Sequence, residues 1–412
     1  MAVVAFRAWP RRRKIIAVSA LFAVVLGGLV WWRGERFYLR WLFESPRSGR
    51  CQTHLDRQLL SRSIQLGTGF LLTHQRPEGN FDYEYDWRED VLSDEDQETR
   101  QAGALWGLAL LYQDDRRPQL ATAIEHGLDF FDEHSRLNKG VRCTVYPGSS
   151  EGVTGTIALV ALSYIEYLRV APNLASERRA LFEARLGEYL QMLTKATHPS
   201  GVWYGGYDID TCKPHGDPSP YSDGEALLAL VKAAKYLGHR ELLPQLMSAA
   251  AAGKRINIDQ ALAKEADSDV TKGFYQWSTM AFYELATSDF PDTKSYGDTV
   301  LKLADWMIDE HAILTRNRNT GYAFEGLTHA YALAKQRGDH ARQAKYGCVI
   351  DIGLEHLLSW QVGGPRSNRY TAKAPDNQAL GGVQNSAFEP ALRIDVTQHQ
   401  MHATQLARQY VY

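Results

Sequence analysis

The feature that most constrains the fold is a helical periodicity that recurs along the chain from residue 56 to residue 410. Apolar side chains return every three or four positions, and clusters of Gly, Pro, Asp and Asn separate one periodic segment from the next. Strand-like runs are few, short and confined to the loops. The pattern predicts an all-α domain with twelve helices, at 56–75, 97–114, 117–134, 153–170, 174–196, 222–238, 240–252, 269–288, 293–312, 321–338, 340–361 and 396–410.

The connections between these helices alternate in length. Short links such as 170–174 and 338–340 follow the even-numbered helices, whereas long links such as 76–96 and 197–221 precede them. Six helical hairpins closed into an (α/α)6 toroid account for this alternation, because the even-numbered helices then line the inside and the long loops gather at their N-terminal ends. Stretches rich in small residues, such as TGTIALVAL and GEALLALVKAA, suit the crowded inner positions.

The N-terminal segment has the character of a membrane anchor. Residues 15–32 are uncharged and apolar, the basic cluster RRRK precedes them, and Trp31 and Trp32 close the run. This predicts a cytoplasmic segment at 1–14, a transmembrane helix at 15–32, a juxtamembrane linker at 33–50 and a barrel domain at 51–412. A cleaved signal peptide is the alternative, but no small-residue cleavage site follows the run. We expect a single-pass inner-membrane protein whose C-terminal domain lies in the periplasm.

The distribution of charge argues against nucleic acid as a partner. The chain carries 46 Lys and Arg against 48 Asp and Glu, but residues 1–40 hold eight of the basic side chains and one of the acidic. The remainder therefore has 38 basic and 47 acidic groups, which repels a polyanion.

The four cysteines show no zinc spacing, and we expect no cofactor and no metal site. Cys143 and Cys212 lie in polar, turn-rich stretches and could form a disulfide. Cys348 lies in an apolar helical pattern, which favours a buried thiol.

Two of the long loops alternate acidic and aromatic side chains. Aromatic rings stack on the apolar faces of sugars and carboxylates accept hydrogen bonds from sugar hydroxyls, so this composition predicts a carbohydrate cleft. The other interpretation is that the aromatics pack on the barrel rim and the acids are solvated. The candidate substrate-binding residues in these loops are Asp82, Tyr83, Tyr85, Asp86, Trp203 and Tyr207.

Carboxylates near the starts of inner helices are candidates for catalysis. Asp223 and Glu225 begin the sixth helix, and Glu325 lies among the small residues of the tenth. Asp223 could be a helix N-cap or a support residue. We expect Glu225 and Glu325 to form the acid and base pair of a glycoside hydrolase. First-turn candidates on the inner helices also include Arg100, Tyr221, Lys272, Tyr275, Gln276, Trp277 and Tyr322.

The last helix suggests a different chemistry. Asp395, Gln398, His399 and His402 follow the i, i+3, i+4, i+7 spacing and share one helical face. This stripe is either a buried polar network or part of a catalytic face. In the second case His399 would be a base oriented by Asp395, with Arg393 as an anion partner, for removing the proton next to a uronate carboxylate. Tyr275 or Tyr322 could take the place of His399, and Arg100 would act with Arg393.

The pattern resembles the (α/α)6 barrels of six-hairpin glycosidases, polysaccharide lyases and the C-terminal domain of D-glucuronyl C5-epimerases, over about residues 50–412. The stretches that carry the resemblance are RPEGNFDYEYD, ETRQAGALWGL, YSDGEALLAL, NTGYAFEGLTHAYAL and FEPALRIDVTQHQMHA. It implies a polysaccharide or oligosaccharide partner. We therefore expect a membrane-anchored glycoside hydrolase; the alternatives are a uronate lyase or C5-epimerase, and a non-catalytic glycan-binding subunit of a polysaccharide synthesis or export complex.

Overall fold

The computed structural model describes residue 51 and residues 55–171, 173–387 and 389–412. The predicted cytoplasmic segment, transmembrane helix and linker at 1–14, 15–32 and 33–50 lie outside the described residues. Within the described ranges, no helix combines the length and the apolar character that crossing a bilayer requires. The described residues from 55 onward form one compact unit.

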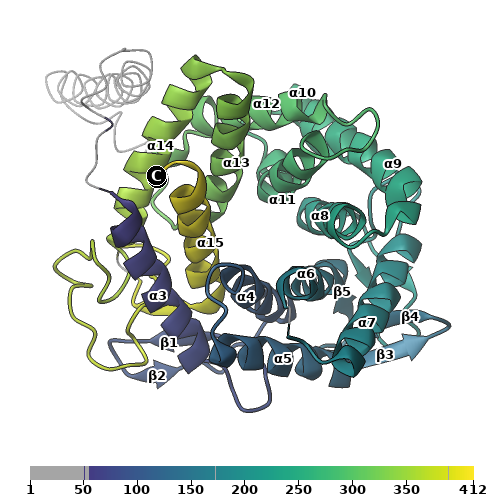
Figure 1. Cartoon of the computed structure of the whole chain (residues 1–412), viewed down its shortest axis with the longest axis horizontal. Helices are drawn as coiled ribbons and strands as arrows, with labels where there is room; N and C mark the ends of the chain where they lie inside the picture. Colours follow the sequence, from purple (N-terminus) through teal and green to yellow (C-terminus); the bar gives the residue numbers. More distant parts are fainter. Residues whose placement is uncertain (1–50, 52–54, 172, 388) are drawn as a thin grey trace, which may run out of the picture. The chain divides into compact units, whose positions relative to one another are not determined.

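This unit is a ring of six inner helices surrounded by outer helices, as Figure 1 shows. Consecutive inner helices contact one another, and the last contacts the first, so the ring is closed. The prediction of an all-α (α/α)6 toroid is confirmed. The inner helices are α4 (Glu98–Leu111), α6 (Thr154–Val170), α8 (Pro220–Tyr236), α11 (Asp269–Ala286), α13 (Gly321–Arg337) and α15 (Ile394–Tyr410). The outer helices are α3 (Arg57–Thr73), α5 (Pro118–Glu133), α7 (Ser176–Lys195), α9 (Leu243–Gly253) with α10 (Ala261–Lys264), α12 (Tyr296–Asp309) and α14 (His340–Leu358).

Inner and outer helices differ in burial as their sequences predict. On α6 every residue from Thr154 to Leu168 is buried, whereas α7 buries one face. A helix that is surrounded on all sides needs small residues where a neighbour approaches closely. A Cβ atom on Gly326 of α13, for example, would lie 2.8 Å from the hydroxyl oxygen of Tyr275 on α11. Small residues on the inner helices therefore let the ring close tightly.

The outer helix between α8 and α11 is longer than predicted. The sequence suggested a helix at 240–252 and a loop at 253–268, but the chain continues from α9 through a π-helical turn, Lys254–Gln260, into α10. In this turn the buried Asn257 donates a hydrogen bond to Asp223 at 2.9 Å. The turn thus attaches the outer layer to the start of α8.

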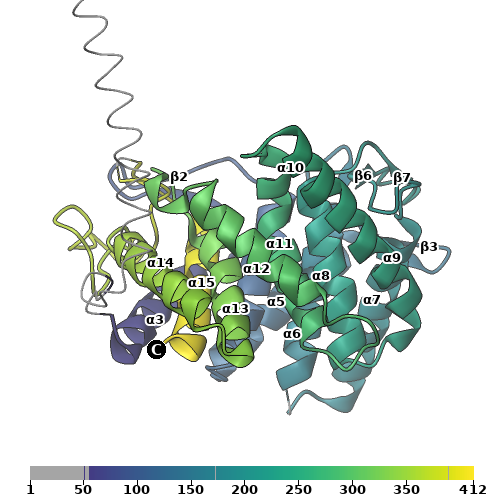
Figure 2. The same ribbon diagram turned by 90° about the horizontal axis from the view of Figure 1, so that it is seen from above.

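Short strands occupy the long loops at one end of the ring. The sheets are β2 (Val91–Leu92), β1 (Glu84–Asp86) and β8 (Ala391–Arg393); β3 (Ser135–Asn138) and β4 (Val141–Thr144); and β5 (Gly152–Val153), β6 (Gly206–Tyr207) and β7 (Pro214–His215), all antiparallel. Figure 2 shows β2, β6 and β7 at one end of the unit and the C-terminus at the other. The loops gather at the N-terminal ends of the inner helices, as predicted.

A disulfide links two of these loops. Cys143 of β4 is bonded to Cys212, which lies between β6 and β7. No described cysteine is free. Cys348 is also disulfide-bonded, so the prediction of a thiol at this position was wrong.

Candidate active site

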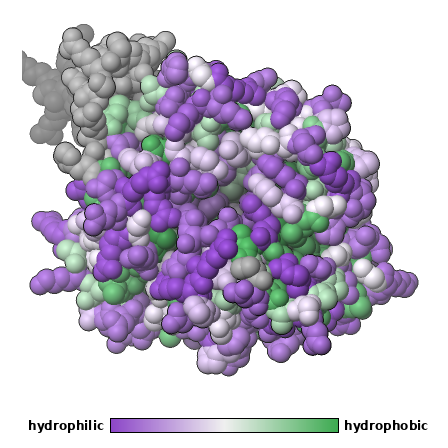
Figure 3. All heavy atoms as spheres, viewed as in Figure 1, coloured by the Kyte–Doolittle hydropathy of each residue, from purple (hydrophilic) through white to green (hydrophobic). Residues whose placement is uncertain are grey.

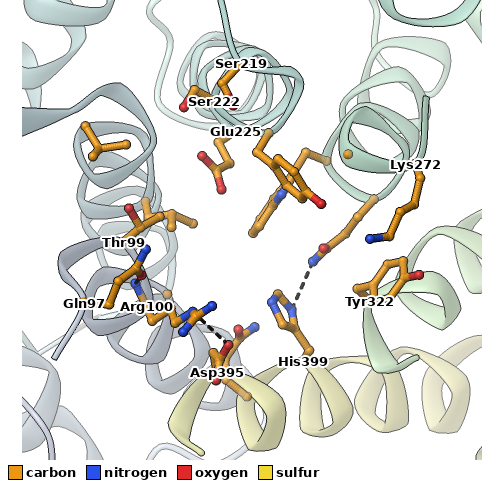
Figure 4. A pocket seen from close by; sticks show the side chains of 18 residues that line it. Gln97, Thr99, Arg100, Ser219, Ser222, Glu225, Lys272, Tyr322, Asp395 and His399 are labelled. Atoms are coloured by element: carbon orange, nitrogen blue, oxygen red, sulfur yellow. Dashed lines mark hydrogen bonds and ion pairs between the residues drawn. The ribbon is translucent and has the colours of Figure 1, made fainter. Parts of the chain in front are cut away.

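A cavity of about 470 Å³ opens at the N-terminal ends of the inner helices. All six inner helices contribute to its wall, so residues far apart in sequence meet there (Figure 4). The polar and aromatic lining side chains are those of Gln97, Thr99, Arg100, Ser219, Tyr221, Ser222, Glu225, Lys272, Gln276, Trp277, Tyr322, Asp395, Gln398 and His399. This is the end at which the sequence predicted a site.

Glu225 enters the cavity from α8 as a buried carboxyl group. Its side chain is 4% exposed, and its Oε2 atom has no hydrogen-bond partner within the described part of the chain. Gly155 on α6 makes room for it, because a Cβ atom there would lie 2.2 Å from Oε2. Burial raises the pKa of Glu225 to about 8. The group is therefore protonated at neutral pH and can act as a proton donor.

His399 enters the same cavity from α15, on the opposite side (Figure 4). Its Nδ1 atom lies 3.1 Å from Oε1 of Glu325, and its side chain is 24% exposed. Burial opposes the charged imidazolium, but the Glu325 carboxylate outweighs this and raises the pKa of His399. Because Nδ1 faces Glu325, Nε2 is the ring nitrogen available to a ligand.

Glu325 lies behind His399. It is completely buried, its Oε1 is also 3.3 Å from Nδ1 of His402, and the Gln276 amide donates to Oε2. Burial opposes its ionisation, yet His402 and His399 together lower the pKa of Glu325 to about 2. An ionised carboxylate against Nδ1 orients the imidazole and stabilises its protonated form. His399 and Glu325 therefore form a coupled imidazole–carboxylate pair.

Asp395 lines the cavity as half of an ion-pair cluster. Arg393 donates two hydrogen bonds to its carboxylate, at 3.0 and 2.5 Å, and Nε of Arg100 lies 3.3 Å away. The Tyr83 hydroxyl accepts a hydrogen bond from Arg100. Burial opposes ionisation of Asp395, but Arg393 outweighs it and the pKa stays below its usual range. Asp395 is therefore an anion that forms ion pairs with two guanidinium groups.

The balance of charge in the cavity favours an anionic ligand. Arg100 and Lys272 are cations, Asp395 is an anion, and Glu225 is neutral when protonated. Lys272 has no ion-pair partner among the described residues. The N-termini of the inner helices also direct the positive ends of their dipoles to this face. A carboxylate or phosphate group would lower the electrostatic free energy of the cavity.

The predicted pair of Glu225 and Glu325 is not assembled in the structure. Glu325 does not line the cavity, and its neighbours hold it ionised. Oε1 of Glu325 instead lies 3.1 Å from Nδ1 of His399, which is the position that the sequence suggested for Asp395.

Three predicted residues of the first loop have structural contacts in place of a ligand. Asp82 pairs with Arg76 at 2.6 Å, and Asp86 accepts hydrogen bonds from backbone amides within its own turn. The buried Tyr85 donates to Asp90 at 2.8 Å. These side chains hold the loop, and none of the three lines the cavity.

The third loop and its neighbours are likewise packed inside the rim. The Trp203 backbone amide donates to Asp223 at 3.0 Å, which explains the buried position of Asp223 below the start of α8. Tyr207 is fully buried and hydrogen-bonded to Thr144, and Tyr275 is fully buried against Gly326. The helix N-cap is Ser219, not Asp223. Burial excludes these side chains from contact with a sugar in this conformation.

The structure thus brings together part of the predicted set. Glu225, Arg100, Tyr322, Asp395 and His399 line one cavity, and Tyr83 and Arg393 contact its lining. Sequence reasoning missed Gln97, Thr99, Ser219 and Ser222. Their signal was their position in the first turn of α4 and α8, or next to it; the predicted helix starts already placed Gln97, Thr99 and Ser222 there, and only Ser219 lay outside.

Comparisons with known proteins identify the fold. No protein-family model matches the sequence, and no curated protein matches it. A D-mannose isomerase structure superposes with a TM-score of 0.60 at 13% identity, covering 88% of this chain and 99% of the other. The cellobiose 2-epimerase of Bacillus thermoamylovorans gives 0.60 at 9% identity, covering 85% and 99%. An unsaturated glucuronyl hydrolase specific for heparin gives 0.58 at 11% identity, covering 85% and 97%. The resemblance to six-hairpin (α/α)6 proteins is confirmed as a likeness of fold.

Proposed function

We propose that this chain is a carbohydrate-active enzyme that moves a proton on an acidic sugar, with His399 as the general base and Glu225 as the general acid. The observation that carries the proposal is their placement. α8 and α15 are opposite each other in the ring, and each directs one of these groups into the same cavity (Figure 4). A protonated acid facing an oriented base is the apparatus of proton transfer.

The cavity supplies the remaining requirements of the reaction. Lys272 and Arg100 would bind the carboxylate of a uronate ring, and its neutralisation makes the adjacent C5 proton more acidic. Nε2 of His399 would take this proton, and Glu325 would stabilise the resulting imidazolium. Glu225 would then give its proton either to C5 on the other face, which yields the epimer, or to the leaving oxygen at C4, which yields an unsaturated product.

Proteins of the same fold support a sugar as the substrate. The solved structures include a mannose isomerase, a cellobiose 2-epimerase and a hydrolase of unsaturated glucuronyl groups. The fold therefore accommodates rearrangement of sugars and recognition of an acidic one. A polysaccharide or oligosaccharide rich in uronate is the partner that we propose.

Hydrolysis is the second candidate, and one observation favours it. Glu225 is protonated and Asp395 is ionised in the same cavity, which is the division of roles that a glycosidase needs. Asp395 would take the place predicted for Glu325. We rank this reaction second because the two arginines that bind Asp395 reduce its basicity.

The test is incubation of the full-length protein with uronate polysaccharides in deuterated buffer. We expect deuterium at C5, with or without an unsaturated product that absorbs in the near ultraviolet, and His399→Gln should lose both signals. New reducing ends without either signal would replace the proposal by hydrolysis. Saccharide binding with no chemical change would mean that the protein is a non-catalytic glycan-binding subunit.

We also propose that the enzyme works outside the cytoplasm, attached to the inner membrane by residues 15–32, where it could accept a chain from a polysaccharide synthesis or export complex. The Cys143–Cys212 disulfide supports an oxidising compartment. A C-terminal alkaline phosphatase fusion should be active. An inactive phosphatase fusion together with a fluorescent cytoplasmic reporter fusion would contradict this orientation.

A further inference from the structure

Gln398 is a buried amide that the rest of the protein leaves unused. Its side chain reaches the cavity from α15, one position before His399, and the residue is 1% exposed. Neither its Nε2 nor its Oε1 has a hydrogen-bond partner among the described residues. A buried amide without partners destabilises a protein, so its retention calls for a ligand.

Other buried glutamines show that the fold can satisfy such groups. Gln101 donates to the Phe81 carbonyl and accepts from its amide, and Gln361 bonds to Ser63 through both its oxygen and its nitrogen. On α15 itself, Gln405 donates to the backbone oxygen of Leu110 at 3.1 Å, although its Oε1 atom has no partner among the described residues. Gln398 differs from these glutamines because both of its polar atoms lack a partner.

The neighbouring helix α4 has two glycines next to the Gln398 side chain. A Cβ atom on Gly107 of α4 would lie 2.2 Å from Cγ of Gln398, and one on Gly103 would lie 3.9 Å from its Oε1. Glycine inside a helix is unfavourable compared with alanine. Gly107 leaves space for the Gln398 stem, and Gly103, which lines the cavity, leaves open space beside the amide.

The cavity also has an apolar side. Trp277, which lines it, packs against Trp106 of α4, and Trp106 is completely buried and also contacts His402; both ring-centroid distances are 5.2 Å. The amide therefore shares the cavity with an apolar surface as well as with Arg100 and Asp395.

We propose that Gln398 binds the sugar ring itself, through two neighbouring hydroxyl groups. A carboxamide presents one donor side and one acceptor side, so Nε2 donates to one hydroxyl oxygen while the other hydroxyl donates to Oε1. Lys272 and Arg100 hold the acidic group, and Gln398 fixes the rotation of the ring in front of His399. This inference rests on the proposed function in taking the ligand to be a saccharide that lies in front of His399; the contact of Gln398 with the ring does not require the acidic group.

A stability measurement tests the unused amide without any substrate. Gln398→Leu should raise the melting temperature of the full-length protein by about 1–3 °C, because it removes two unsatisfied polar atoms and little volume. Gln405→Leu on the same helix is the matched control and should lower it, because its hydrogen bonds are lost. If Gln398→Leu lowers the melting temperature as much as the control does, the inference is overturned, because the amide would then stabilise the fold.

Calorimetric titration with the methyl glycosides of glucuronic acid and of glucose tests the ligand. Gln398→Leu should lower the affinity for whichever glycoside the wild type binds by at least tenfold. Gly107→Ala should lower this affinity less, and Gln405→Leu should leave it unchanged. Equal affinity of wild type and Gln398→Leu would overturn the inference. A wild-type preference for the neutral glycoside, with Gln398→Leu still impaired, would instead overturn the acidic substrate and leave the role of Gln398 intact.

Discussion

The two ends of the barrel axis differ in how their buried polar and charged groups are paired. At the N-terminal ends of the inner helices, Glu225 and Gln398 are buried without partners, and Lys272 has no ion pair within the described ranges. At the other end, a cavity of about 140 Å³ is lined by Lys232 and Glu284, among others. There the charged groups are matched with one another.

The matched end is a network of carboxylates and amines. Lys232 donates to the fully buried Glu166, and Lys235 and Tyr236 both donate to Glu284, at 2.7 and 2.6 Å. Burial opposes ionisation of Glu284, but Lys232 and Lys235 lower its pKa to about 2. Charges are satisfied here by the protein, which marks a structural role, whereas the unsatisfied groups of the upper cavity are left for a ligand.

Hydrophilic residues also surround the centre of the ring on the face seen in Figure 3. Surface polarity alone therefore does not distinguish a site from a structural network. What distinguishes the two ends is the pairing of particular buried carboxyl groups: Glu166 and Glu284 accept hydrogen bonds from lysines, whereas Oε2 of Glu225 has no partner among the described residues.

The largest expected effect is on turnover at the upper cavity. Glu225→Gln and His399→Gln should each reduce the rate of C5 proton exchange by about 10²–10⁴-fold, because each removes one of the two proton-transfer groups. His356→Gln, on the outer helix α14, is a matched control and should retain wild-type activity. Near-normal exchange in both cavity variants would end the contrast between the two ends.

Lys232→Met should produce the largest loss of stability. It removes the cation that Glu166 and Glu284 share and leaves them with the cations Arg169 and Lys235, respectively; breaking a buried ion pair costs up to about 3–5 kcal/mol in unfolding free energy. Lys302→Met removes an exposed pair with Asp259 and should cost less than about 1 kcal/mol. Chemical denaturation measures both; equal losses would show that the lower network is not specially stabilising.

Glu225 at the upper end and Glu284 at the lower end should make pH-dependent contributions to stability of opposite sign. Glu225 has a raised pKa, so the unfolded state releases its proton first and stability falls as pH rises from about 4.5 to about 8. Glu284 has a lowered pKa, so its contribution is complete above about 4.5 and is lost as pH falls toward 2. Glu225→Gln should reduce the fall in stability between about pH 4.5 and about pH 8. Glu284→Gln should reduce the fall in stability below about pH 4.5. Identical profiles for both variants would contradict the assignment.

The smallest effect should come from the cationic side of the cavity. Lys272→Met should weaken binding of an anionic saccharide by about fivefold, because a partly exposed charge contributes about 1 kcal/mol. The difference from wild type should shrink as salt is added. A salt-independent loss would mean that Lys272 acts by packing and not by charge.

Much of the architecture could be predicted from sequence because the helices are long and their connections alternate. Most predicted ends, such as 321–338 for α13, lie within three residues of those observed. The exception is α9, since the π-helical turn after Gly253 depends on Asn257 reaching Asp223 and leaves no periodic signal.

The site could be predicted only in part, because periodicity gives the face of a helix and not what covers it. Glu325 and Glu225 are both buried, inward carboxyl groups, but His399 and His402 lie against Glu325, whereas Oε2 of Glu225 has no partner among the described residues. Likewise the composition of the loops is the same for a binding platform as for a packed rim, and Tyr85 and Trp203 belong to the rim.

The most direct test of the central claim is the protonation state of Glu225 in the unliganded enzyme. Carbon-13 NMR of the glutamate side-chain carboxyls, assigned by Glu225→Gln, follows this group through a pH titration. We predict a carboxyl signal that titrates with a pKa near 8 and that moves when His399 is replaced. A signal that titrates near 4.5 and ignores His399 would show a solvated carboxylate, and the proposed proton transfer would lose its acid.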